Sequence, residues 1–386
     1  MLAVAGASAH AIALSAVVIG IGIAARRAGV LTSAGCKQLS ALQVTFLEPA
    51  LAISALSSLT SADLAAGSPL LLWAPIHCIM ALAVGYLLLP ASAHRGPLLL
   101  CTAFGNAGAL PNALVPALLP ASNASQGLLF VQVYLVTWRL LLWSVGPALL
   151  TSEQHKKTDG AASAAPARPS LRAMLLPPPS VGSLLGLALA FAPVAARKLF
   201  LGGPLAFLVA AAQQAGGAAA PIALITLGFA LSGGSDDGKV SGDGKGGGSG
   251  GKGGGSGANA FTRTELAACV AIRLIIMPCL HIALISSGGS TATPPPPPEP
   301  AAFSWPLFAS SARAPPAMPA GVGSRIDDPF ALVLLLQAGM PSAMSVQAIF
   351  QRSGVDTRPL GELMAWQYVL AAPCIVAQVV AASALM

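Results

Sequence analysis

Apolar segments of about 20 residues recur along almost the whole chain. A segment of this length forms a helix that can cross the hydrocarbon core of a bilayer. Ten such segments are predicted, and they cover residues 8–28, 39–60, 68–90, 97–119, 127–150, 177–196, 204–232, 264–287, 328–350 and 361–385. Only 9% of the residues are charged, against roughly a quarter in soluble domains, so we predict an all-α polytopic membrane protein.

Polar and low-complexity stretches divide the apolar segments. A basic loop, 151–176, separates residues 1–150 from residues 177–386, with five segments in each part. Within the second part, 233–262 is rich in Gly, Ser, Lys and Asp, and 288–326 contains the run PPPPPEP. Both compositions are typical of flexible chain, so we predict two disordered insertions there.

Lys and Arg lie mostly on one predicted side of the membrane. When the N-terminus is placed outside the cytosol, 14 of them fall in cytosolic segments and 4 on the opposite side. Cytosolic loops carry an excess of these residues, so both termini are predicted to be non-cytosolic. The net charge of +7 therefore indicates orientation in a membrane and does not indicate nucleic-acid binding.

Five segments in each half place the two halves in opposite orientations, which is the inverted-repeat architecture of many secondary transporters. Prolines recur in corresponding segments of the two halves. The number of residues between the two members of a pair increases after each insertion. The pairs are Pro49 with Pro221, Pro75 with Pro278, Pro111 with Pro341, and Pro147 with Pro373.

Segments four and nine each contain Gly and Pro near the centre. They read FGNAGALPNALVP (104–116) and LQAGMPSAMSVQ (336–347). Broken helices at matching depth in two repeats indicate a transporter's binding site, and the half-helix after each break suits an anion. Two ordinary proline kinks packed by neighbouring helices are the alternative. The residues in question are Asn106, Pro111, Asn112, Pro341, Ser342 and Ser345.

Four of the ionisable side chains inside predicted spans are candidates for coupling or charge balance, since such groups are usually functional. Glu48 either carries a coupling proton or pairs with a basic residue. His77 either titrates near neutral pH or stays neutral and hydrogen-bonded to a helix carbonyl. Arg139 needs a partner, and Arg273 either holds helices together or balances an anion.

Motifs of other chemistries are missing from the sequence. The six Cys have no spacing that resembles a metal site or a disulfide framework, so neither a metal nor a cofactor is predicted. No HExxH, no paired intramembrane Asp and no Gly-x-Ser-x-Gly with a suitable His is present, which argues against an enzyme.

One run of the sequence, LLWAPIHCIMALAVGYLLLPASAHRGPLLLCTAFGNAGALPNALVPALL (71–119), resembles the auxin efflux carrier superfamily and is most similar to its plant and algal PIN-LIKES branch. The similarity extends through all ten segments and skips the two insertions. Its further parts are PPSVGSLLGLALAFAP (178–193), AAPIALITLGFALSGG (219–234), RTELAACVAIRLIIMP (263–278), LLLQAGMPSAMSVQAIFQ (334–351) and ELMAWQYVLA (362–371).

This resemblance implies ten helices in two inverted five-helix repeats, in which broken helices four and nine cross at Pro111 and Pro341. Segments one, two, six and seven would form a scaffold through which a homodimer assembles, and the others would form a transport domain. The implied activity is secondary carriage of auxin (indole-3-acetate) or a related organic anion by alternating access, which contributes to intracellular auxin homeostasis. The implied location is the endoplasmic reticulum membrane in preference to the plasma membrane.

At the level of residues, the resemblance implies that Asn112 contacts the substrate carboxylate and that Gln132 lies near the polar groups of segment five. Two positions depart from the branch's pattern. Glu48 replaces Asn in "NPAL", and Ser345 replaces Asn in "PPAMN". Three readings stay open: an auxin carrier, a carrier of the same fold for a different organic anion, and a membrane receptor that transports nothing. The expected partners are a small organic anion and membrane lipid.

Overall fold

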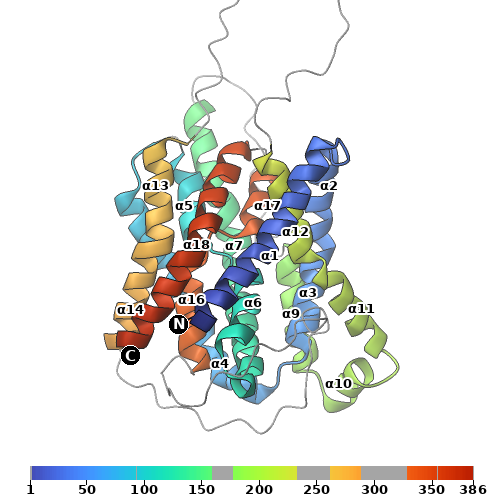
Figure 1. Cartoon of the computed structure of the whole chain (residues 1–386). Helices are drawn as coiled ribbons and strands as arrows, with labels where there is room; N and C mark the ends of the chain where they lie inside the picture. Colours follow the sequence, from blue (N-terminus) through green and yellow to red (C-terminus); the bar gives the residue numbers. More distant parts are fainter. Residues whose placement is uncertain are drawn as a thin grey trace, which may run out of the picture.

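The structure is a computed structural model that describes residues 2–92, 94–158, 177–232, 261–287, 328–353 and 355–385. Within these ranges the ordered elements are helices, which run side by side as a bundle (Figure 1). The one strand-like pairing in the described part is an isolated bridge between Gly105 and Ser342. The predicted insertion 288–326, almost all of 233–262, and most of the basic loop 151–176 lie outside the described residues.

The helical elements follow the predicted apolar segments closely. They are α1 (Leu2–Arg27), α2 (Ser33–Leu42), η1 (Gln43–Leu47), α3 (Glu48–Ser57), α4 (Ser61–Leu88), α5 (Arg95–Ala103), α6 (Ala109–Leu118), α7 (Ala121–Thr158), α9 (Pro178–Ala190), α10 (Val194–Leu201), α11 (Ala206–Gly217), α12 (Ala219–Leu231), α13 (Arg263–Ala271), η2 (Ile272–Ile276), α14 (Met277–Ser287), α16 (Pro329–Gly339), α17 (Met344–Arg352) and α18 (Arg358–Leu385). Each of the ten predicted ranges contains one helix or several in series.

By length and composition, six helices in the described residues can cross a membrane, and a seventh is added if α9 and α10, bent by 117°, form one span. The interrupted passages α5–α6 and α16–α17 consist of halves of 9 to 11 residues, which are too short to be counted singly. The chain is thus a polytopic helical membrane protein. The count of ten spans and the inverted repeat remain predictions.

The outer surface and the chain ends agree with a membrane setting. Large apolar side chains such as Leu72, Leu87 and Phe207 are exposed on the outside of the bundle, where lipid would cover them. The start of α1 and the end of α18 lie at the same end of the bundle (Figure 1). An even number of crossings produces this arrangement.

Helix contacts divide the bundle into two groups. The α3 group consists of α1, α2, η1, α3, α9, α11 and α12, and the α7 group consists of α4, α5, α7, α13, η2, α14, α16 and α18. The half-helices α6 and α17 lie at the seam: both pack on α7, while α6 also meets α1, and α17 also meets α2 and α12 (Figure 1). Any site at the start of α6 or α17 therefore lies between the two groups.

Glycines bring helices of the α3 group into close contact. A Cβ atom on Gly22 of α1 would lie 2.2 Å from the carbonyl oxygen of Ile225, and one on Gly228 of α12 would lie 2.1 Å from that of Ile19. The backbones of α1 and α12 therefore touch directly. Close backbone approach through small residues is the usual way in which helices associate in lipid.

Two π-helical turns interrupt otherwise regular spans. The turn η1 ends just before Glu48 and Pro49, and η2 contains Arg273 and ends shortly before Pro278. Proline cannot donate a backbone hydrogen bond, and its ring crowds the preceding turn. A local widening of the helix accommodates this, and such turns occur frequently at functional positions. Both turns carry residues of the site described below.

Candidate functional site

The two interrupted helices cross and pair with each other. Between α5 and α6, the N–H of Asn106 donates to the carbonyl oxygen of Pro341 at 2.6 Å. Between α16 and α17, the N–H of Ala343 donates to the carbonyl oxygen of Phe104 at 2.9 Å. Backbone groups freed inside a membrane must find protein partners, and each break here supplies them to the other. The two breaks therefore form one structural unit, here called the crossing.

The crossing lies at Pro341 but not at Pro111. Pro341 is part of the irregular segment, whereas Pro111 is the third residue of α6, inside its first turn. The first-turn N–H groups of a helix have no intrahelical partner, so a proline there removes no helical hydrogen bond. In the first break, Phe104 and Asn106 make the backbone hydrogen bonds to the second break, and Gly105 between them pairs with Ser342.

Arg273 occupies the side of the crossing where α5 and α16 end. Its side chain is 1% exposed. Nε donates to the carbonyl oxygen of Met340 at 2.6 Å, Nη1 to that of Thr102 at 3.2 Å, and Nη2 to that of Gln337 at 3.1 Å. These oxygens belong to the last turns of the two half-helices, whose C-terminal carbonyls lack intrahelical donors. One guanidinium therefore caps both half-helices.

A buried group of aromatic and imidazole rings stands behind Arg273. Arginine can only donate, so its Nη1 donates to Nε2 of His77, 3.2 Å away. His77 is therefore the neutral tautomer with the proton on Nδ1, which donates to the hydroxyl of Tyr134 at 3.1 Å. His281 donates from Nδ1 to the carbonyl oxygen of Met277 at 3.0 Å, and its ring centroid lies 4.6 Å from that of His77. The predicted alternative for His77 was a bond to a helix carbonyl, but its partners here are the side chains of Arg273 and Tyr134.

Gly105 is required by the position of Arg273. A Cβ atom at Gly105 would lie 1.5 Å from Nη2 of Arg273. At the end of α16, a Cβ atom at Gly339 would lie 2.1 Å from Oε1 of Gln378. The glycines at the two breaks thus make room for side chains that cap the half-helices.

Several predicted site residues hold the crossing together. Asn106 accepts from the N–H of Ala109, which caps α6, and donates from Nδ2 to the hydroxyl of Tyr368 at 2.8 Å. Ser342 donates from Oγ to the carbonyl oxygen of Cys101 at 2.8 Å, and its N–H donates to Oε1 of Gln367 at 2.6 Å. Both side chains are buried. The hydrogen-bonding capacity of these two residues is used within the protein.

The opposite side of the crossing, where α6 begins, carries two amides. Nε2 of Gln132 on α7 donates to Oδ1 of Asn112 in the first turn of α6, at 3.2 Å. Gln132 is 2% exposed, and its Oε1 has no hydrogen-bond partner in the described part of the chain. The structure therefore brings two predicted binding residues together and leaves polar capacity unused beside them.

The beginning of α17 carries a charged cluster. Oε1 of Glu48 accepts from Oγ of Ser345 in the first turn of α17 and from Nε2 of Gln43, each at 3.0 Å. Arg139 on α7 interacts electrostatically with Glu48, and its side chain is 6% exposed. Nη1 of Arg139 has no hydrogen-bond partner among the described residues. The side chains of Glu48 and Arg139 thus attract each other electrostatically.

One face of α7 connects the two clusters. Gln132 and Arg139 are seven residues apart, which places them on the same helix face at roughly 10 Å along the axis. These two polar side chains, which are separated by the apolar Leu135 and Val136, lie beside the starts of α6 and α17 and are here called the polar strip.

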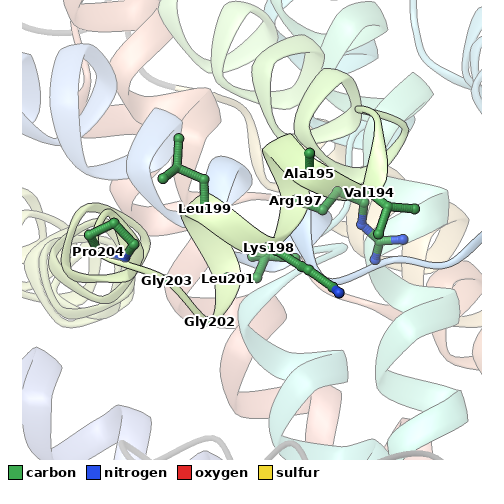
Figure 2. Close-up of a pocket in the computed structure, with 9 residues that line it drawn as sticks. All are labelled: Val194, Ala195, Arg197, Lys198, Leu199, Leu201, Gly202, Gly203 and Pro204. Carbon is green, nitrogen blue, oxygen red and sulfur yellow. The ribbon is translucent and has the colours of Figure 1, made fainter.

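A surface cavity of about 720 Å³ lies away from the crossing, at the outer edge of the α3 group. It is formed by α10 and the turn after it, and its lining combines apolar side chains with two basic ones (Figure 2). The lining residues are Val194, Ala195, Arg197, Lys198, Leu199, Leu201, Gly202, Gly203 and Pro204. It contains none of the predicted site residues.

Sequence reasoning did not single out several residues that complete the crossing. His281, Gln367 and Gln378 are buried polar side chains inside apolar helices, and Tyr134 and Tyr368 supply hydroxyl groups. A polar residue in an apolar span is itself a signal of function, so the histidine and the two glutamines were detectable by type. Their partners are distant in sequence and were not.

Apolar helices packed around two interrupted helices that cross at their breaks are the architecture of many membrane transporters. The chain belongs to the membrane transport protein family, whose sequence profile it matches over residues 8–294. This match includes the first interrupted helix, α5–α6, while α16, α17 and α18 lie beyond it. No significant match is found among curated proteins.

Proposed function

We propose that the protein is a secondary carrier that moves a small organic anion across a membrane by alternating access, with auxin (indole-3-acetate) as the first candidate substrate. The observation that carries this proposal is the polar strip at the seam between the two helix groups. Two half-helices begin there, and their N-terminal ends each present about half a positive charge. Arg139 and Gln132 contribute polar atoms without hydrogen-bond partners beside these ends.

The position of the strip suits alternating access. It lies between the α3 group and the α7 group, so a movement of one group against the other would expose it to one side and then to the other. The contacts of Ser345 with Glu48 and of Gln347 with the carbonyl oxygen of Thr226 cross this seam. These contacts would break and re-form during each cycle.

The resemblance to auxin efflux carriers supports the choice of substrate, and the family shown for the chain supports transport in general. The PIN-LIKES resemblance also supports the endoplasmic reticulum membrane, ten spans in two inverted repeats and a homodimer through the α3 group. Both chain ends at one end of the bundle agree with termini on the same, non-cytosolic side (Figure 1). A carrier of the same fold for another organic anion is the second candidate, because fold does not fix the solute.

The test is uptake of labelled indole-3-acetate by proteoliposomes, with protein-free vesicles as background. We expect protein-dependent uptake, and we expect Asn112→Ala to reduce it at least 10-fold. Asn123→Ala is the matched control, since Asn123 lies at the start of α7 and outside the strip. Uptake of another organic anion but not of auxin would correct the substrate. Absence of any anion uptake by folded protein would overturn the carrier.

A further inference from the structure

Glu48 lies where an incoming carboxylate would bind at the second half-helix. It is the first residue of α3 and belongs to the α3 group, yet its carboxylate accepts a hydrogen bond from Ser345 of α17 across the seam. Gln43, one turn earlier in the same span, donates to the same oxygen. A hydroxyl in the first turn of a helix, an amide and a guanidinium are the groups that recognise a carboxylate.

The two half-helix starts therefore differ in what they offer to a ligand. At α6, the side chains are the neutral amides Asn112 and Gln132. At α17, the carboxylate of Glu48 already accepts from the first-turn hydroxyl of Ser345. The side chains at the start of α6 are neutral, with Asn106 capping one of its N–H groups, whereas a carboxylate lies beside the start of α17.

The charges at the seam leave room for one more negative charge. Each half-helix start contributes about half a positive charge, and Arg139 contributes a full one. Glu48 is the single acidic side chain in this cluster of described residues, and α9, α11 and η1, which pack against α3, carry no ionisable residue. After Glu48 is balanced, about one positive charge remains, and one monovalent anion would neutralise it.

We infer that Glu48 makes the carrier selective for anions of a single negative charge. This inference rests on the proposed function and names the substrate class of the same site. The substrate carboxylate binds at the start of α6, with Asn112 and Gln132. A second carboxylate on the same solute would point along α7 toward Arg139 and come under the negative field of Glu48. Two carboxylates in one low-dielectric site repel each other strongly, so dicarboxylates are rejected.

The experiment compares hexanoate with adipate, which have the same carbon chain and one or two carboxylates. Binding to purified protein is measured by titration calorimetry, and uptake of labelled adipate is measured in proteoliposomes, because its dianion crosses lipid poorly. For the wild type, we expect hexanoate to bind at least 10-fold more tightly than adipate. For Glu48→Gln, we expect adipate affinity to rise at least 10-fold, with adipate uptake appearing, while hexanoate affinity changes less than 3-fold.

Two further variants keep the test decisive. Glu362→Gln is the matched control, since Glu362 is an exposed acidic residue on α18, and it should leave both affinities unchanged. Ser345→Ala removes one hydrogen bond to Glu48 but not its charge, so it should raise adipate affinity by a smaller factor than Glu48→Gln. If Glu48→Gln fails to fold, the adipate affinity of Ser345→Ala tests the inference in its place.

The outcomes separate this inference from the proposed function. Hexanoate binding without any gain of adipate affinity in the folded variants would overturn the inference and leave the carrier intact. Equal wild-type affinity for hexanoate and adipate would overturn it as well. If no organic anion binds to wild type or variant, the proposed function fails and the inference fails with it.

Discussion

The two sides of the crossing are built from the same kind of parts and are completed in opposite ways. On one side, α5 and α16 end, and the carbonyl oxygens of Thr102, Gln337 and Met340 all accept from Arg273. On the other side, α6 and α17 begin, and Gln132 and Arg139 keep atoms without hydrogen-bond partners in the described structure. The protein's own groups satisfy the first side, here called the closed side, whereas the second, open side keeps polar atoms that are available to a ligand.

Electrostatics explains why the closed side needs an arginine and no carboxylate. Each half-helix end contributes about half a negative charge, so two ends balance one guanidinium. Arg273 therefore needs no acidic side chain as a partner, because the backbone carbonyl groups at the two helix ends provide the counter-charge. The comparison teaches that a pair of broken helices creates two sites of opposite sign, of which only the positive one is available to a solute.

The largest effect is expected for Arg273→Met. The change leaves three carbonyl oxygens and His77 without a donor in the membrane interior, and loss of one partner of a buried charged network costs about 3–5 kcal/mol. The thermal midpoint in detergent should fall by roughly 5 °C, or folded protein should not be recovered. Arg273→Lys should lie in between, because an ammonium group has three donors and cannot reach all four acceptors.

The control for this prediction is Arg263→Met, an exposed position on the same span. It should change the midpoint little, since surface substitutions are usually within about 0.5 kcal/mol. If Arg273→Met were as stable as Arg263→Met, Arg273 would not be what closes this side of the crossing.

A smaller effect is expected for Gly105→Ala, which adds one methyl group to the closed side. The new Cβ would lie 1.5 Å from Nη2 of Arg273, so the guanidinium must move and its hydrogen bonds must weaken. Overpacking of this kind costs about 1–3 kcal/mol. Chemical unfolding monitored by fluorescence would measure the loss.

Gly108→Ala is the matched change, because Gly108 lies three residues later in the same break. There the new Cβ would lie 3.5 Å from Leu135, which is an ordinary contact. We expect Gly108→Ala to be nearly neutral. Equal destabilisation by both variants would mean that the break as a whole, and not the approach of Arg273, is sensitive to size.

The local sequence was sufficient to predict where the two helices break, but it did not predict which residues contact the breaks. Gly and Pro inside apolar segments located both interruptions, and the polar residues beside them identified Asn112 and Ser345, whereas Gln132 was predicted from the family resemblance. Pro111 shows the limit of this reasoning. Proline type alone does not distinguish a helix break from a first-turn position that tolerates proline, and the crossing itself depends on Gly105.

Long-range contacts account for what the sequence could not provide. Arg273 reaches Thr102 across 171 positions, and Gln337 donates to the carbonyl oxygen of Ala107 across 230 positions. Nothing in the local pattern at Arg273 distinguishes a cap of two helix ends from a ligand for an anion, and both roles were considered. The electrostatic attraction between Glu48 and Arg139 was easier to predict, because a buried charge in a span requires a partner.

The smallest effect on stability is expected on the open side, for Gln132→Leu. Oε1 of Gln132 is buried without a partner, so removal of the amide eliminates a desolvated acceptor as well as one hydrogen bond to Asn112. These contributions oppose each other, and the free energy of unfolding should change by less than about 1 kcal/mol. Anion uptake should nevertheless fall about 10-fold, because Asn112 loses the neighbour that orients it. The comparison would be reversed if Gln132→Leu were destabilised as strongly as Gly105→Ala and retained full uptake. Gln132 would then be a packing residue, and the polar strip would not bind the anion.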